Sequence, residues 1–274
     1  MLKRLVAGFA GVILSATLAS AQTDEIDRLL DLLELDAYLT IVAEEGVQDA
    51  LGIEDEMFAG RGGSAWEALV ADVYDPETIK STFKTRFVAA MDGVDLAPIF
   101  AFYDTDQGAR IITGELMARQ GMRDEDVEAA AIVAYEDLVG EIDPRRALID
   151  GFMDVNDLVE RNVMGALNTN FAFLSGMAEN DIFAARLTQS EIIARVYERE
   201  NELRVDAREW LQAYYVLAFD GLANADIQAY IEHADSPSGK AFNRAVFEGF
   251  DAFFDQSSFR LGRAAADFIS GQDL

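Results

Sequence analysis

The hydrophobic positions of the chain recur at steps of three and four over most of its length. Ile26, Leu30 and Leu33 begin one such stripe, which predicts an amphipathic helix over residues 24–44. Phe83 and Phe87 belong to another, in a helix that starts after residue 75. No segment alternates apolar and polar residues between hairpin turns, as strands would. The pattern therefore predicts an all-α protein, a helical array or bundle.

Helix starts are marked by capping residues. Asp75 and Asp143 each precede a proline, a pairing in which the aspartate caps the helix and the proline occupies its first turn. Thr188 and Glu191 have the spacing of a capping box. From these signals we expect one long helical stretch from 144 to about 178, another charged stretch from 191 to 209, and a flexible break at 60–63.

Two stretches predict a helix that ends, turns a corner and starts again. The first is 102–108, Phe-Tyr-Asp-Thr-Asp-Gln-Gly, and the second is 233–239, His-Ala-Asp-Ser-Pro-Ser-Gly. Thr105 and Ser236 are the expected caps, and Pro237 suits the first helical position. Gly108 and Gly239 lie in the first turn, where a missing side chain lets another helix approach closely.

A shift of the chain by about 131 residues superimposes the two corners on each other. Asp104 then aligns with Asp235, and Gly108 aligns with Gly239. We interpret this as two divergent copies of one helical unit. The expected units are 22–141, containing a helix-corner-helix at 95–120, and 142–274, containing one at 226–254.

The first corner, Asp-Leu-x-x-Ile-x-x-Phe-Tyr-Asp-Thr-x-x-Gly, resembles the hallmark of the bacterial domain-of-unknown-function family 2059. Members carry a Phe-Tyr-x-Ser-Pro-x-Gly-like corner, usually behind a signal peptide. The first copy keeps Phe102 and Tyr103, and the second keeps the Ser-Pro pair. Residues 79–120 and 210–250 cover the two matches. The resemblance implies an envelope-associated helical domain, and it implies no activity. The motif residues are assigned a structural role: Phe102, Tyr103, Asp104, Thr105, Gly108, Asp235, Ser236, Pro237 and Gly239.

The N-terminus has the three parts of a secretory signal peptide. Lys3 and Arg4 precede an apolar run over 5–18, and Ala19-Ser20-Ala21 is a small-x-small cleavage site. The run is short for a bilayer span, which needs about 20 apolar residues. We therefore expect cleavage after Ala21, a periplasmic or secreted protein, and no membrane insertion of the mature chain.

Composition narrows the function classes. The formal net charge is −28, so the surface repels nucleic acid, and the chain has no cysteine. Lipoprotein anchoring and thiolate chemistry are thereby excluded, and no cofactor is expected. The acidity itself is interpreted as a solubility feature.

One stretch has part of the spacing of a calcium-binding loop. Asp104, Asp106 and Glu115 fall at loop positions 1, 3 and 12, but Ala109 stands where the sharp turn requires glycine. A capped helix corner explains both copies more simply, so no metal site is predicted. His233, the single histidine, is interpreted as a packing residue because no nucleophile motif accompanies it.

Catalytic residues are therefore not assigned, and the binding residues are unknown. The favoured hypothesis is a non-enzymatic interaction or structural module of the bacterial envelope, with an envelope protein or peptide as its partner. Two alternatives stay open: an envelope hydrolase that uses two carboxylates, and a calcium- or cation-binding module. A deep cleft with two facing carboxylates favours the hydrolase.

Overall fold

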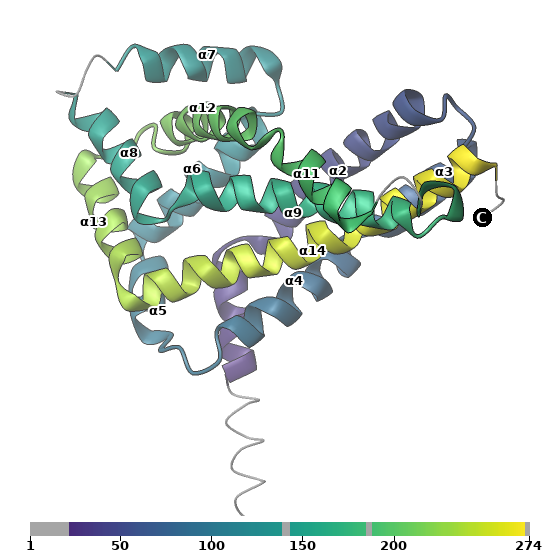
Figure 1. Ribbon diagram of the computed structural model, residues 1–274. Coiled ribbons are helices and arrows are strands. Elements are labelled where there is room, and N and C mark those ends of the chain that lie inside the picture. Colours follow the sequence, from purple (N-terminus) through teal and green to yellow (C-terminus); the bar gives the residue numbers. More distant parts are fainter. Residues whose placement is uncertain (1–21, 139–142, 185–187, 272–274) are drawn as a thin grey trace, which may run out of the picture.

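The computed structural model describes residues 22–138, 143–184 and 188–271, and these are all-α, with no strand. A first helix covers residues 22–32. Thirteen further helices follow in the described ranges (Figure 1): α2 (Leu35–Met57), α3 (Gly63–Val73), α4 (Pro76–Ala90), α5 (Ala97–Tyr103), α6 (Asp106–Gly121), α7 (Glu125–Glu136), α8 (Pro144–Val155), α9 (Leu158–Ala178), α10 (Asp181–Ala184), α11 (Gln189–Tyr197), α12 (Glu200–Ala218), α13 (Asn224–Asp235) and α14 (Pro237–Ser270).

The long helix α14 is the central element. It runs across the molecule with α9 on one side and α4 on the other (Figure 1). Helix α12 packs on α6, α7 and α9, and α13 packs on α8. A single large core joins these helices, so residues of both expected units contribute to it, for example Phe83 and Phe87 from α4 with Phe242 and Phe253 from α14.

A smaller core fills the narrow end of the molecule, where α2 and α3 meet the C-terminal half of α14. Trp66 and Phe58 are fully buried there, and Phe268 packs against both rings. The indole N–H of Trp66 donates to the carbonyl of Ala50, 3.0 Å away, which satisfies the one polar atom of this side chain. This end is therefore fixed by aromatic packing.

The capping signals of the sequence correspond to helix starts in the structure. Asp75 accepts from the N–H of Thr78 at 2.9 Å, and Asp143 accepts from that of Arg145 at 2.8 Å. Thr188 and Glu191 form a complete capping box. Short polar side chains at these positions satisfy N–H groups that lack a partner within the helix.

Three expected helices are interrupted. The predicted helix over 24–44 breaks at Glu34, where α2 begins and continues to Met57. The stretch 144–178 breaks at Asn156 and Asp157, and the charged stretch breaks before α12. Glu34 and Asp157 both have positive φ, at 50° and 54°, which is unfavourable for residues other than glycine. The apolar periodicity continues across these breaks, so the local sequence favours an uninterrupted helix. We therefore attribute the breaks to packing against other helices.

The glycine segment at 60–63 is ordered by a carboxylate. One oxygen of Glu54 accepts from the N–H groups of Gly62 and Gly63, at 2.9 and 2.8 Å. The expected break between two helices is present, and α2 supplies the anion that the free N–H groups at the start of α3 need.

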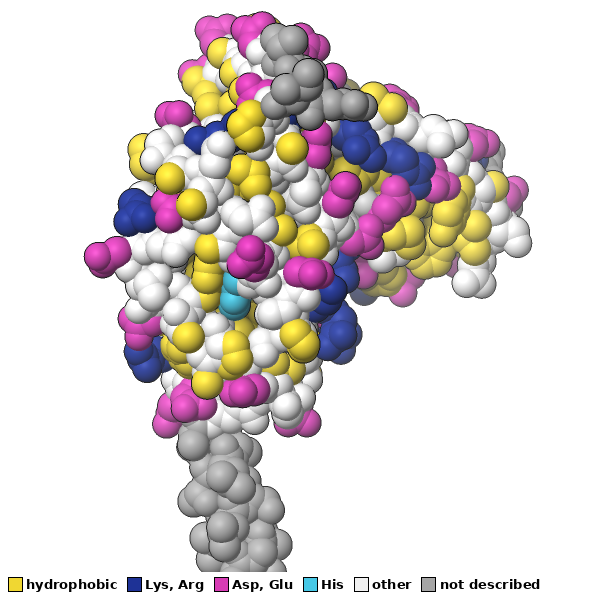
Figure 2. Space-filling view, turned by 90° about the vertical axis from the view of Figure 1, so that its left-hand side faces the viewer, with side chains coloured by type: hydrophobic (Ala, Val, Ile, Leu, Met, Phe, Trp, Pro, Cys, Tyr) yellow, Lys and Arg dark blue, Asp and Glu magenta, His cyan; other side chains and the backbone are white. Residues whose placement is uncertain are grey.

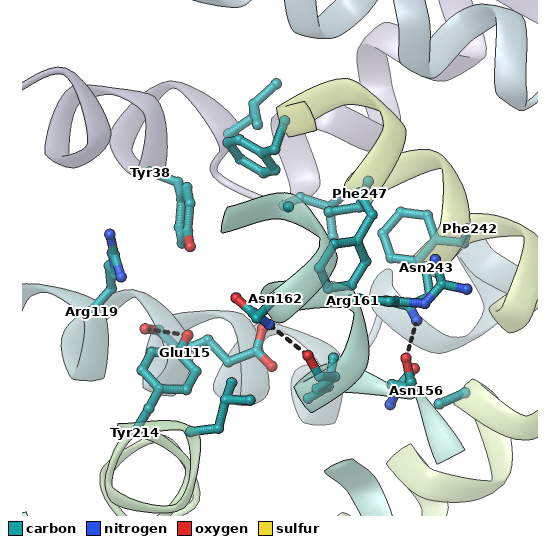
Figure 3. A pocket seen from close by; sticks show the side chains of 18 of the residues that line it. Tyr38, Glu115, Arg119, Asn156, Arg161, Asn162, Tyr214, Phe242, Asn243 and Phe247 are labelled. Atoms are coloured by element: carbon teal, nitrogen blue, oxygen red, sulfur yellow. Dashed lines mark hydrogen bonds between the residues drawn. The ribbon is translucent and has the colours of Figure 1, made fainter. Parts of the chain in front are cut away.

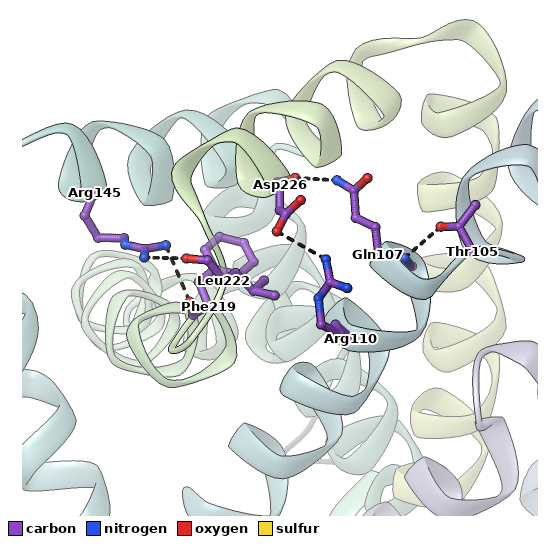
Figure 4. Close-up of polar contacts among 8 residues, drawn as sticks. Thr105, Gln107, Arg110, Arg145, Phe219, Leu222 and Asp226 are labelled. Atoms are coloured by element: carbon purple, nitrogen blue, oxygen red, sulfur yellow. Dashed lines mark hydrogen bonds and ion pairs between the residues drawn. The ribbon is translucent and has the colours of Figure 1, made fainter.

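Polar contacts link the first corner to α13, and α8 to the C-terminal end of α12 (Figure 4). Gln107 donates to the carbonyl of Asp226 at 3.1 Å, and Arg110 pairs with the Asp226 carboxylate at 3.3 Å. Arg145 donates to the carbonyls of Leu222, at 2.7 Å, and Phe219. A guanidinium at this position stabilises the C-terminal end of α12, where carbonyl groups lack partners within the helix.

The expected signal peptide lies outside the described residues, as does the expected boundary between residues 141 and 142. Among the helices of the described ranges, none combines the length and the hydropathy that crossing a bilayer requires. Acidic side chains are scattered over the face in Figure 2, which views the side of α8 and α13.

Candidate functional site

The two corners have the same local geometry. The Thr105 hydroxyl accepts from the N–H of Gly108 at 3.0 Å, and the Ser236 hydroxyl accepts from that of Gly239 at 3.0 Å. Each hydroxyl also donates to the carbonyl three residues before it, at 2.7 and 2.6 Å. These are the residue pairs that the 131-residue shift aligns.

Glycine is required at both corners because the preceding helix passes too close for a side chain. A Cβ on Gly108 would lie 2.6 Å from the carbonyl oxygen of Phe102, and one on Gly239 would lie 2.1 Å from that of His233. Real Cβ atoms do not approach backbone so closely. The glycines therefore set the sharp angle between the helices.

The corners contact each other through aromatic rings. Phe102 stacks on His233 with a centroid distance of 4.2 Å and an interplanar angle of 6°. Tyr103 lies edge-on to the same imidazole. Burial lowers the pKa of His233, and its Nε2 has no hydrogen-bond partner. His233 is thus a packing residue within this aromatic stack, and Figure 2 shows the single histidine at the surface of this face.

The residues of the calcium-like spacing do not converge. Asp104 forms an exposed ion pair with Arg28, and Asp106 lies in the exposed first turn of α6. Glu115 is two turns further along the same helix. Because residues 106–115 are helical, they cannot wrap around an ion as a loop would. No group of three acidic or histidine side chains suited to a metal occurs in the described residues.

A cavity of about 550 Å³ is lined by α2, α6, α9, α12 and α14, together with residues of the first helix, α4, α5, α8 and α13 (Figure 3). Its walls are mainly aromatic: Tyr38, Phe83, Phe87, Tyr103, Phe152, Trp210, Tyr214, Tyr215, Tyr230, Phe242, Phe247, Phe250 and Phe254. The exposed Asn162 also belongs to the lining, so the cavity reaches the surface at α9. Its volume is in the range of small-molecule sites, about 300–1,000 Å³.

The two corners contribute equivalent positions to this cavity. Under the 131-residue shift the lining residues of α5 and α6 align with lining residues of α13 and α14. The pairs are Tyr103 with Ala234, Ile112 with Asn243, Glu115 with Val246, and Arg119 with Phe250. The cavity is therefore situated where the two helix-corner-helix segments face each other.

Glu115 is the most perturbed carboxyl group of the cavity. Desolvation by the surrounding protein raises its pKa to about 7, although the Tyr230 hydroxyl, which donates to Oε1 at 3.1 Å, acts in the opposite direction. The Tyr214 hydroxyl donates to the backbone carbonyl of the same residue at 3.0 Å. Glu115 is thus held between α12 and α13 with its carboxyl group at the cavity.

Two arginines and one further acid also line the cavity. Arg119 pairs with Glu45 and lies over the Trp210 ring, 5.2 Å from its centroid. Arg161 lies 5.3 Å from the centroid of Phe247. The Nε of each arginine is buried without a hydrogen-bond partner. Polar groups are therefore few and localised, and apolar surface dominates.

Asp251, on α14, has a pKa raised to about 6. Desolvation is the main cause, the neighbouring Asp255 and Glu248 act in the same direction, and Arg161 opposes them. Glu115 does not contribute to this shift, nor Asp251 to that of Glu115. The carboxylates that act on Asp251 are thus Asp255 and Glu248, on its own helix, and Glu115 is not one of them.

Comparison of the chain with protein-family models, curated proteins and solved structures gives no match. The class defined by the fold and the site is an all-α protein with an internal aromatic cavity.

The helix corners around this cavity could be predicted from the sequence, and the polar residues that line the cavity could not. The corners, the caps and the 131-residue correspondence were all visible in it. Glu115 was considered only as a calcium ligand, and Arg119, Arg161 and Asp251 were not singled out. Applying the shift to the apolar stripes of α6 and α14 would have placed Glu115 opposite Val246, as a lone acid on an apolar face.

Proposed function

We propose that the chain is a non-enzymatic binding module of the bacterial envelope, and that the aromatic cavity holds the apolar part of its ligand. The observation that carries the proposal is the cavity of about 550 Å³ between the helices, with phenylalanine and tyrosine walls. An apolar site of this size removes most of a small ligand's surface from water, which is the main source of its affinity.

The location in the envelope rests on the signal-peptide pattern of residues 1–21, and the resemblance to family 2059 is compatible with it. Both stay predictions. A non-enzymatic role is favoured over hydrolysis because aromatic and aliphatic side chains dominate the cavity wall, and the two carboxyl groups in its lining, Glu115 and Asp251, lie on different helices. His233 has no hydroxyl nucleophile among its hydrogen-bond partners in the described residues.

Filling the cavity tests this function. Ala166 lines the cavity on α9, whereas Ala130 is exposed on α7. We expect decanol, titrated by isothermal calorimetry below its solubility limit, to bind the unmodified protein with a stoichiometry of one. Ala166→Phe should weaken binding at least about tenfold, because the ring occupies the space of the ligand. Ala130→Phe should leave it unchanged.

Thermal melting and circular dichroism of both variants check that they remain folded. Decanol binding that is equally strong in Ala166→Phe and in the unmodified protein would contradict the assignment of the cavity. An absence of decanol binding to the folded, unmodified protein would contradict the proposed function itself.

A further inference from the structure

Glu115 is a charged group without a cationic partner in the cavity. Its one side-chain hydrogen bond comes from Tyr230, through Oε1. No ion pair of the described residues includes Glu115. Figure 3 shows the side chain extending from α6 into the pocket near Tyr214 and Asn162. One carboxylate oxygen, Oε2, is therefore available to a ligand.

The two arginines of the cavity are each close to a carboxylate. Arg119 pairs with Glu45 across α6 and α2. Arg161 is near enough to Asp251 to lower the pKa of that carboxyl group. Arg119 is thus compensated by an ion pair, and Arg161 has the Asp251 carboxyl group nearby, whereas the Glu115 carboxylate has no ion pair among the described residues.

We propose that the cavity takes a ligand with one positive charge on an apolar body, and that its ammonium group binds the Glu115 carboxylate. This inference rests on the proposed function, since it names the ligand class of the same cavity. The ammonium would donate to Oε2, while the apolar body occupies the space between α9 and α14.

Three properties of the molecule support a cation over a neutral or anionic ligand. Aromatic rings line the cavity beside Glu115, among them Tyr214 and Tyr230, and aromatic rings attract cations electrostatically through their π faces. A carboxylate in a desolvated site gains strongly from a paired charge, because the surrounding protein screens little. The net charge of −28 also concentrates cations near the surface and repels anions.

Binding should depend on pH through Glu115. Its pKa of about 7 means that the ionised fraction increases between pH 6 and pH 8. Arg119 is the positive group on the same helix. Five tyrosines around Glu115 have pKa values raised by burial, so they stay neutral in this range: Tyr38, Tyr103, Tyr214, Tyr215 and Tyr230. Glu45 pairs with Arg119, and Asp251, with a pKa of about 6, and His233, with a lowered pKa, line the same cavity, so the Glu115→Gln variant is needed to assign the pH dependence to Glu115.

Three ligands with the same chain and different head groups test the inference: decylammonium, decanol and decanoate, each below its critical micelle concentration. At pH 8 we expect decylammonium to bind the unmodified protein at least about tenfold more tightly than decanol, with decanoate weakest. Decylammonium binding should strengthen several-fold from pH 6 to pH 8, and decanol binding should not. Glu115→Gln should abolish the preference for decylammonium and keep decanol binding.

Glu209→Gln is the matched control. Glu209 is exposed on α12 next to Trp210, so its removal changes the net charge equally but leaves the cavity intact. If Glu209→Gln lowers decylammonium affinity as much as Glu115→Gln, the preference comes from overall charge and the inference fails.

The outcomes separate this inference from the proposed function. Tighter binding of decanol or decanoate than of decylammonium would overturn the charge assignment and support the cavity as an apolar site. Preference for decanoate would assign the head group to the arginines instead. A lack of binding by all three ligands would contradict the proposed function.

Discussion

Glu115 carries a free-energy cost that its neighbours only partly offset. A carboxyl group enclosed by tyrosine rings loses hydration when it ionises, and one hydroxyl hydrogen bond does not replace that hydration. Each unit of pKa difference between the folded and unfolded states corresponds to about 1.4 kcal/mol. With a pKa of about 7, raised from 4.5, Glu115 should make the free energy of unfolding depend on pH.

The sign of this dependence follows from proton binding. Between pH 4.5 and 7 the folded state holds the Glu115 proton that the unfolded state releases, so stability decreases as the pH increases through this range. Glutamine cannot ionise. We therefore expect the free energy of unfolding of Glu115→Gln, relative to that of the unmodified protein, to increase by about 2–3 kcal/mol when the pH increases from 5 to 8. Urea denaturation at both pH values measures this difference.

Asp251 and His233 are present in both Glu115→Gln and the unmodified protein. Their contributions to the pH dependence of the free energy of unfolding therefore cancel in the difference between the two. Glu209→Gln serves as the control and should show the pH dependence of the unmodified protein. A constant stability difference between Glu115→Gln and the unmodified protein from pH 5 to 8 would show that Glu115 titrates as an exposed acid does.

At this scale the sequence could place Glu115 on a helix but not in a cavity. Its position, three residues after Ile112 in α6, is given by helical periodicity. Its burial depends on Tyr214 and Tyr230, about 100 residues further along the chain. The residues next to Glu115 in the sequence therefore do not predict these contacts.

Helices α9 and α14 pack along each other, and glycines permit their close approach. A Cβ on Gly176 of α9 would lie 2.1 Å from the carbonyl oxygen of Phe259 in α14. A Cβ on Gly262 of α14 would lie 2.0 Å from the carbonyl oxygen of Phe173 in α9. The contact is reciprocal, so each backbone packs directly against the glycine of its partner.

Alanine at either glycine of this crossing should be destabilising. We expect Gly262→Ala to lower the free energy of unfolding by at least about 2 kcal/mol, because the backbone of α9 must move to accept the methyl group. Gly52→Ala in α2 is the control, since that site is exposed and nothing lies within 4 Å of the added Cβ. It should stabilise the protein by about 0.5–1 kcal/mol through helix propensity.

Urea denaturation of both variants measures the two effects in one experiment. A stabilising effect of Gly262→Ala that matches that of Gly52→Ala would show that α9 and α14 do not approach as closely as described.

The capped helix starts could be predicted from the sequence, and the interruptions could not. A start depends on a local cap, such as Asp75 or Thr188, so it can be identified from four residues. The breaks at Glu34 and Asp157 require positive φ in residues that disfavour it. They persist only because surrounding helices fix them, and this information is spread over the chain.

The two expected units, 22–141 and 142–274, do not each have a hydrophobic core of their own in the described residues. Helix α14, from the second expected unit, packs along α4 from the first, and the large hydrophobic core includes residues of both. A duplicated unit and a shared core are compatible if the two copies form their core together. The cavity then has a structural origin, since it is located where the equivalent segments face each other.

The net charge has a role at this scale as well. With 50 acidic and 22 basic residues, the chain has a negative field that attracts cations and repels anions. The direction of this field agrees with a cationic ligand for Glu115. Composition alone could not distinguish a general surface property from a selective site, because that distinction depends on which carboxylates are enclosed.

The most direct test of the account is a crystal structure of the protein grown with decanol. We predict electron density for one decanol molecule between α6, α9, α12 and α14, in contact with the Tyr214 and Phe247 rings. Decanol bound only at the outer surface, with the interior filled by repacked side chains, would contradict the central claim that this cavity is the binding site.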